Sequence, residues 1–183
     1  MNCYLDIKIV PDDDIPIYFI RNKVYTKLHK ALSTMKATDI GVSFPKYRVK
    51  LGDVLRIHGT KQRLEALQAM RWLGGLSGYC KVSDVLPVPE KVKYRVISRI
   101  QSNMTEAKLR RIIKRGSISS KAVKQYKAKM FSIGLDNPYL ELESNSNGHK
   151  HRRFIQFGEL LDAPIKAVFD SFGLSKTATI PWF

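Results

Sequence analysis

Cysteine is scarce in this sequence, which has only Cys3 and Cys80 among its 183 residues. Two thiols are too few for a disulfide framework or a zinc site, so we interpret both as buried thiols in a reducing compartment. Long apolar runs are also absent, since none approaches the roughly 20 residues that cross a bilayer. The N-terminal segment is typical of neither a signal peptide nor a transit peptide. We therefore expect a cytoplasmic protein with no membrane partner.

Sequence patterns that hold phosphate groups or metal ions are missing as well. The sequence contains no Gly-rich phosphate loop and no carboxylate cluster of the kind that holds paired Mg²⁺ ions. His149 and His151 have a spacing that metal ligands can use, but the pattern supplies no third ligand. We therefore predict neither a metal site nor a cofactor.

Acidic residues are few where basic residues are most frequent. The chain has 32 basic and 16 acidic side chains and a formal charge of +16. Residues 91–129 hold 13 of the cations and a single acid, Glu106. A charge run is often only a solvated face, but neutralisation by neighbouring acids is scarce here. The distribution therefore favours a nucleic-acid partner.

Residues 94–116 carry the clearest pattern, an alternating strand followed by a helix that a glycine stops. On the helix, Leu109, Ile112 and Ile113 can share a core face. The helix also carries a stripe of cations, formed by Lys108, Arg111 and Arg115. This stripe is flanked by Arg110 and Lys114. Cations gathered in this way repel one another unless an anion lies alongside, so we predict that this helix binds a polyanion.

The first half of the chain has the element order βαββαβ. Alternation predicts a strand over residues 3–9, and apolar spacing predicts a helix over 17–35 with His29 beside its buried stripe. Two short strands, a helix over 61–72 and a final strand follow. This order predicts a ferredoxin-like domain over residues 1–90 and the α+β fold class.

The second half is predicted to form a smaller α+β domain over residues 91–183. Pro87-Val88-Pro89 is the expected hinge between the two halves. After the basic helix we predict a second helix over 119–130, then two strands on either side of a Ser- and Asn-rich loop. The aromatic C-terminus is expected to be held in the core.

Short motifs spread over nearly the whole chain carry a family resemblance. In order they are Tyr4-Leu5-Asp6-Ile7, Leu28-His29, Ile40-Gly41-Val42-Ser43-Phe44-Pro45, Leu55-Arg56-Ile57-His58, Ser98-Arg99-Ile100-Gln101, Ser144-x-Ser146-x-Gly148, Arg152-x-Phe154-Ile155, Gly173-Leu174-Ser175-Lys176 and Pro181-Trp182-Phe183. Their order and spacing together resemble the small Csy-type endoribonuclease of subtype I-F CRISPR systems. The resemblance implies cleavage of CRISPR repeat RNA at a hairpin, in pre-crRNA, with the product crRNA kept in a surveillance complex with other subunits.

The resemblance also implies the catalytic residues. His29 matches the general base, and Ser144 matches the serine that fixes the 2′-hydroxyl, with Ser146 as its support. Both serines also suit a turn that caps its own loop. Phe172 stands where the best-known relatives have a tyrosine, and phenylalanine lacks the hydroxyl that would help to place the histidine. Orientation of His29 must then come from packing or from another hydrogen-bond donor.

The remaining candidates would bind RNA. The resemblance implies an aromatic platform at the position of His151, where an imidazole can stack on a base or share in the proton transfer. Arg99 and Gln101, two apart on a strand, suit the reading of adjacent base edges near the foot of a hairpin. The basic positions expected along the RNA are Lys108, Arg110, Arg111, Lys114, Arg115 and Arg152.

The leading hypothesis is a metal-independent, hairpin-specific endoribonuclease that uses the 2′-hydroxyl of RNA as its nucleophile. The alternative is a non-catalytic RNA-binding protein, such as a ribosomal or chaperone component with the same basic helix. Cleavage of a cognate hairpin in EDTA discriminates between the two.

Overall fold

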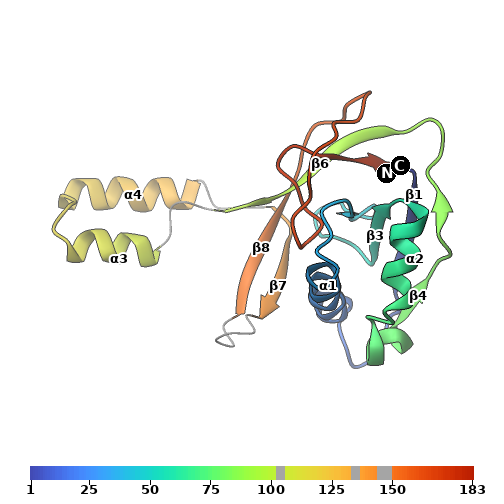
Figure 1. Ribbon diagram of the computed structural model, residues 1–183. Helices are drawn as coiled ribbons and strands as arrows, with labels where there is room; N and C mark the ends of the chain where they lie inside the picture. Colours follow the sequence, from blue (N-terminus) through green and yellow to red (C-terminus); the bar gives the residue numbers. More distant parts are fainter. Residues whose placement is uncertain (102–105, 133–136, 144–149) are drawn as a thin grey trace.

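The computed structural model describes residues 1–101, 106–132, 137–143 and 150–183. Within these residues the chain is an α+β protein with two antiparallel sheets, and helices α3 and α4 stand away from both (Figure 1). The predicted α+β class is therefore confirmed. No helix in the described part of the chain is long and apolar enough to cross a membrane.

The first sheet has the strand order β2-β3-β1-β4, and every neighbouring pair is antiparallel. Its long central strand buries Leu5, Ile7 and Ile9, as the alternation predicted. Because successive side chains point to opposite faces, this row gives the sheet one apolar face. The strands are β1 (Cys3–Ile9), β2 (Gly41–Ser43), β3 (Val54–Gly59) and β4 (Cys80–Val82).

Helix α1 (Ile17–Thr34) packs its apolar stripe into the protein as predicted. The buried stripe consists of Ile20, Val24, Leu28 and Leu32. Helix α2 (Lys61–Ala69) begins at Thr60, whose side chain accepts from the Arg63 N–H. It ends three residues before the predicted end, because Arg71 has a φ of 47° that breaks the helical backbone. A 3₁₀ turn, η1 (Gly74–Tyr79), leads into β4.

The segment predicted as a hinge is held against the first sheet. Strand β5 (Leu86–Pro87) pairs with β1, and the Val88 N–H donates to the carbonyl of Asn2 at 2.9 Å. These contacts fix the chain where it passes from one sheet to the other. The division into domains at this segment stays a prediction.

The second sheet has the order β7-β8-β6-β9 and includes the C-terminus. Arg56 on β3 donates two hydrogen bonds to Asp6 and a third, of 2.9 Å, to the carbonyl of Phe183. The aromatic end of the chain is thus tied to the first sheet, as expected from its composition. The strands are β6 (Lys93–Ile100), β7 (Tyr139–Glu143), β8 (Lys150–Phe157) and β9 (Thr179–Trp182).

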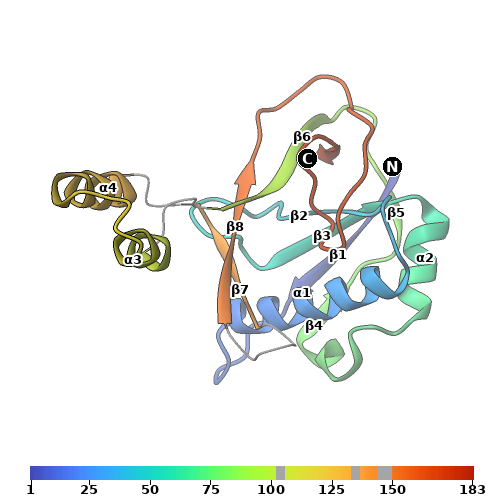
Figure 2. The same cartoon turned by 60° about the vertical axis from the view of Figure 1, so that its left-hand side comes forward.

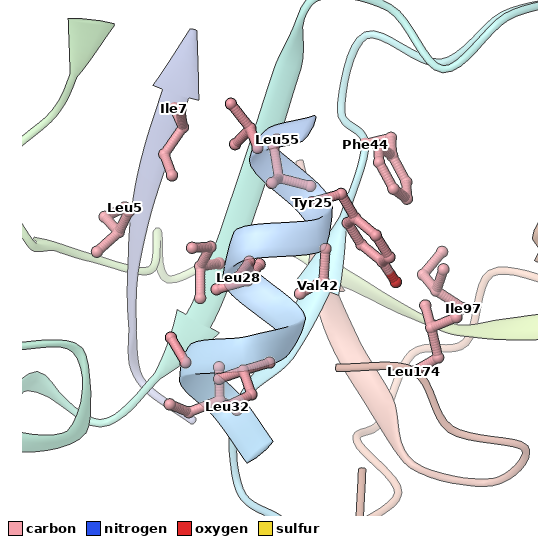
Figure 3. Packing of buried hydrophobic residues seen from close by; sticks show 14 of the residues in the cluster. Leu5, Ile7, Tyr25, Leu28, Leu32, Val42, Phe44, Leu55, Ile97 and Leu174 are labelled. Carbon is pink, nitrogen blue, oxygen red and sulfur yellow. The ribbon is translucent and has the colours of Figure 1, made fainter. Parts of the chain in front are cut away.

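One apolar cluster joins the two sheets through α1 (Figure 3). Tyr25 and Leu28 of this helix lie in the same cluster as Ile97 of β6 and Leu174 near the C-terminus. Helix α1 contacts β1 on one side and β7 on the other. Because close-packed side chains allow little movement, α1 is a rigid support for His29.

Helices α3 (Glu106–Lys114) and α4 (Ser120–Ser132) lie side by side and project from the second sheet (Figures 1 and 2). Gly116 follows the end of α3 with a φ of 67°, so it terminates this helix as predicted from the sequence. The predicted core face is only partly correct, since Leu109 is buried but Ile113 is 48% exposed. The reason is that α3 packs mainly on α4, which covers a narrow stripe.

A buried histidine in the first sheet gives a prediction about stability. His58 is fully buried, its Nε2 lies 2.8 Å from Ser43 Oγ, and burial, then Arg56, then the N-terminal amino group lower its pKa from 6.5 to about 3. Below pH 6.5 the imidazole of His58 therefore takes up a proton in the unfolded chain, whereas in the folded protein it stays neutral until the pH approaches 3. The free energy of unfolding should fall from pH 6.5 towards pH 3, by up to about 1.4 kcal/mol per pH unit from this residue.

Urea unfolding measured at several pH values tests this expectation. Glutamine at position 58 can still bond to Ser43 but does not titrate, so His58→Gln should lose less stability on acidification than the wild type. Equal pH dependence of the two proteins would contradict the assignment.

Candidate active site

His29 lies near the end of α1, half buried at the edge of the core. Its Nδ1 is 2.8 Å from the backbone carbonyl oxygen of Ser171. A carbonyl oxygen can only accept, so Nδ1 carries the hydrogen and Nε2 has the free lone pair. The imidazole is therefore oriented with its proton-accepting nitrogen turned away from the Ser171 backbone.

Phe172 fixes the plane of that imidazole. The two rings are stacked with centroids 3.6 Å apart and an angle of 7° between their planes. Packing was one of the two ways of orienting His29 that the sequence left open, and the stack on Phe172 provides it. The other was a hydrogen-bond donor, but the group 2.8 Å from Nδ1 is the Ser171 carbonyl, which is an acceptor. Both restraints come from one loop, 142 residues away in sequence.

Hydrogen bonds and close packing fix the backbone of this loop. Asp170 Oδ1 accepts from the N–H groups of Phe172 and Leu174, at 2.8 and 3.0 Å. The hydroxyl of buried Tyr25 donates to the Phe172 carbonyl at 2.8 Å. Gly173 has a φ of 70°, and a Cβ at this position would overlap the Val42 side chain. The Gly-Leu-Ser-Lys motif is thus a close turn against β2, and it sets the position of His29.

A pocket of about 480 Å³ opens on the other side of the loop. Its described lining includes Arg99 and Gln101, which the sequence predicted to act together, and also Arg153, Asp170 and Lys176. Cations outnumber the carboxylate, so the pocket suits an anion.

The two candidate serines, Ser144 and Ser146, lie outside the described residues, as does His149. The strand before them ends close to α1, since Glu143 is 4.0 Å from Lys23. Among the residues that the structure describes, no group of three His, Cys, Asp or Glu side chains could hold a metal ion.

The two predicted RNA-binding residues of β8 differ in their surroundings. His151 is exposed and pairs with Leu142 of β7. Arg152 is also exposed, with its guanidinium 4.5 Å from the centre of the Tyr139 ring and 3.9 Å from Glu141. Both are available to a ligand at the surface of the second sheet.

The cations of α3 are exposed on a helix that projects from the body (Figure 2). Arg110 pairs with Glu106 at 3.2 Å, which is the i, i+4 pairing that a single acid allows. The exposed set is Lys108, Arg110, Arg111, Lys114 and Arg115. These cations therefore form a basic surface that lies away from His29.

Sequence reasoning missed Arg153, Asp170 and Tyr25. The sequence did contain a signal for Arg153. On a strand it lies on the same face as Ile155, which is fully buried, whereas Arg152 lies on the opposite face and is exposed. Asp170 accepts from N–H groups two and four residues further along its own loop, which is a local turn pattern that the sequence analysis did not use. Tyr25 had no such signal, since its partner is a backbone carbonyl 147 residues away.

A histidine held through Nδ1 by a backbone carbonyl, a cationic pocket and a separate basic helix together describe an α+β protein that acts on a nucleic-acid backbone. The family described as CRISPR-associated protein (Cas_Csy4) matches residues 4–183. The CRISPR-associated endonuclease Cas6/Csy4 of Escherichia coli (strain UTI89 / UPEC) is 40% identical over 184 residues, and that of Pseudomonas aeruginosa (strain UCBPP-PA14) is 35% identical over 187. Both alignments cover 100% of each chain.

The chain therefore belongs to the Cas_Csy4 family of CRISPR-associated proteins. The resemblance seen in the sequence motifs is confirmed, and so is the predicted enzyme class, an endonuclease.

Proposed function

We propose that the protein is a metal-independent endoribonuclease that cleaves CRISPR repeat RNA at the base of a hairpin. RNA supplies its own nucleophile, because a 2′-hydroxyl lies beside every phosphodiester. A protein therefore needs only to align this hydroxyl and to move protons. The observation that carries the proposal is the hydrogen bond from His29 Nδ1 to the Ser171 carbonyl, which leaves Nε2 as a proton acceptor.

In the proposed reaction, His29 Nε2 takes the proton of the 2′-hydroxyl while the 2′-oxygen forms a bond to the adjacent phosphorus. The bond from phosphorus to the 5′-oxygen breaks, and that oxygen takes a proton from solvent water. The proton held by His29 then passes to the hydroxide that is left, which restores the neutral imidazole. The products are a 2′,3′-cyclic phosphate and a 5′-hydroxyl. Cations beside the phosphate would stabilise the negative charge of the transition state.

We assign Ser144 to holding the 2′-hydroxyl and Ser146 to supporting it. The position of Glu143 beside Lys23 supports this assignment, because the chain then enters the serine segment next to the helix that carries His29. We assign His151 to stacking beneath the nucleotide at the cut, which its exposure on β8 allows.

RNA binding is assigned to the pocket edge and to α3. Arg99 and Gln101 line one pocket, which supports their reading of adjacent bases at the foot of the stem. The α3 cations and Arg152 would line the phosphates of the hairpin, since their side chains are exposed. A stem end is where an A-form major groove is open enough to admit a helix.

The fold and the assembly are proposed as follows. The strand order β2-β3-β1-β4, with α1 and α2 as the crossovers, supports a ferredoxin-like domain over residues 1–90. Residues 91–183 would form the RNA-binding domain. The names of the relatives support a role with crRNA, and we propose that the protein stays on its product with other subunits of a type I-F surveillance complex.

Incubation with a cognate repeat hairpin in EDTA tests the activity. We expect one cut at the foot of the stem, with a cyclic phosphate on the 5′ product identified by mass spectrometry. A single 2′-deoxy substitution before the cut should abolish cleavage while leaving binding intact, because it removes the nucleophile. A protein that shifts the hairpin without cutting it would be the non-catalytic alternative, which the endonuclease names of the relatives disfavour.

A further inference from the structure

Arg153 is a buried cation that the proposed reaction does not use. Its side chain is 5% exposed, and its guanidinium lies 3.5 Å from the centre of the Phe172 ring. The His29 imidazole stacks on the same ring at 3.6 Å. One face of a phenyl ring cannot hold both planar groups at these distances. The Phe172 ring is therefore held between His29 and Arg153.

A second guanidinium, that of Arg99, lies near Arg153 and lines the same pocket. Burial lowers the pKa of Arg153, with Arg99 lowering it further and Tyr25 and Asp170 raising it. The Nε atoms of Arg99 and Arg153 are both buried without a hydrogen-bond partner in the described structure. A buried guanidinium with an unused donor beside a second cation is costly unless a ligand supplies an acceptor and a negative charge.

The pocket beside these two arginines supplies room for such a ligand. Of its described lining residues, Arg99, Arg153 and Lys176 are cations and Asp170 is the carboxylate. Asp170 Oδ1 is already engaged by two backbone N–H groups of its own loop. A base edge is neutral, so a base read by Arg99 and Gln101 would leave the repulsion between the Arg99 and Arg153 guanidinium groups in place. A phosphate of the same strand beside Arg153 would offset it.

We propose that Arg153 binds a phosphate of the RNA strand in this pocket and, through its stack on Phe172, holds that ring against the imidazole of His29. Arg153 is then a positioning residue, and the inference rests on the proposed cleavage of RNA. Phe172 has no side-chain hydroxyl that could form a hydrogen bond. Its ring is therefore held in place by contacts on its two faces. Occupancy of the pocket would thereby be linked to the placement of the general base.

Binding and cleavage can be measured separately to test this role. Affinity is measured with a hairpin that carries a 2′-deoxy nucleotide before the cut. We expect Arg153→Gln to raise Kd about tenfold, the effect of losing one charge-assisted contact, and to make the log–log salt slope shallower by about one. Arg153→Lys keeps the charge and should keep the slope. Arg63→Gln is the matched control, because it removes a cation that pairs with Asp39 on the surface of the first half.

The identity of the ligand is tested by neutral methylphosphonate groups, introduced one at a time near the cut. In the wild type, one position should weaken binding about tenfold. In Arg153→Gln the same position should have no effect, because the charge that it contacts is gone. Equal losses in both proteins at every position would contradict phosphate binding by Arg153.

The single-turnover rate at saturating protein reports the position of His29. Both Arg153→Gln and Arg153→Lys should be about tenfold slower than the wild type, because neither replaces the planar guanidinium on the ring. Lysine should therefore rescue Kd but not the rate. Wild-type rates in the lysine variant would overturn the inference even if Arg153→Gln fails to fold. Absence of cleavage by the wild type would instead contradict the proposed function.

Discussion

Replacing His29 by alanine is expected to slow hairpin cleavage by about 10²–10⁴-fold, which is the usual contribution of a general base. The reason is geometric: Nδ1 is committed to the Ser171 carbonyl and Phe172 fixes the ring plane, so Nε2 is the nitrogen that can accept a proton. Affinity for the hairpin should be unchanged, because the variant retains all the proposed RNA-binding cations. Single-turnover cleavage and filter binding measure the two quantities.

Ser33→Ala is the matched control for this experiment. Ser33 lies one turn further along α1, and its Oγ is 3.5 Å from His29 Nδ1, which is too long for a strong hydrogen bond. We expect the alanine variant to cleave at the wild-type rate. A His29→Ala protein that cleaves normally would remove His29 from the proposed reaction.

Replacing Arg111, Lys114 and Arg115 together by glutamine should weaken hairpin binding by about 10²–10³-fold. These side chains are exposed on α3, a basic surface set apart from the sheets (Figure 2). About five phosphate contacts predict a log–log salt slope near −4 for the wild type, and the variant should be shallower by about 2–3 because counterion release falls with each lost contact. Titrations at several salt concentrations measure both effects.

The neighbouring helix provides a control with the same change of charge. Lys121, Lys124 and Lys127 are exposed on α4, and their triple glutamine variant loses three cations without touching α3. We expect a much smaller loss of affinity from this variant. Equal losses in the two triple variants would mean that net charge, rather than the α3 surface, determines binding.

Repeating patterns in the sequence predicted the elements well where one face is buried. The alternation of β1 and the stripe of α1 match the buried residues, because each period gives the phase of the face that meets the core. The end of α2 and the exposure of Ile113 were predicted less well. Periodicity shows which side chains share a face, but it does not show how wide the covering partner is.

For the site, the motifs selected His29 and Phe172, and these two residues are in contact. Arg153 was passed over for its neighbour Arg152, although strand alternation separates a buried position from an exposed one. The Ser171 carbonyl could not be predicted at all. A backbone acceptor has no residue type to recognise, and its use depends on where a loop folds.

The sequence by itself determined the α+β class, the basic helix with its terminating glycine and the choice of His29 as the candidate base, because these depend on local spacing, charge and motif. The tertiary structure alone decided which nitrogen of His29 is bonded to a backbone carbonyl and what lies on each face of Phe172. Those features join residues on α1, β8 and the C-terminal loop. They exist only because α1 packs between the two sheets and brings distant segments to one place.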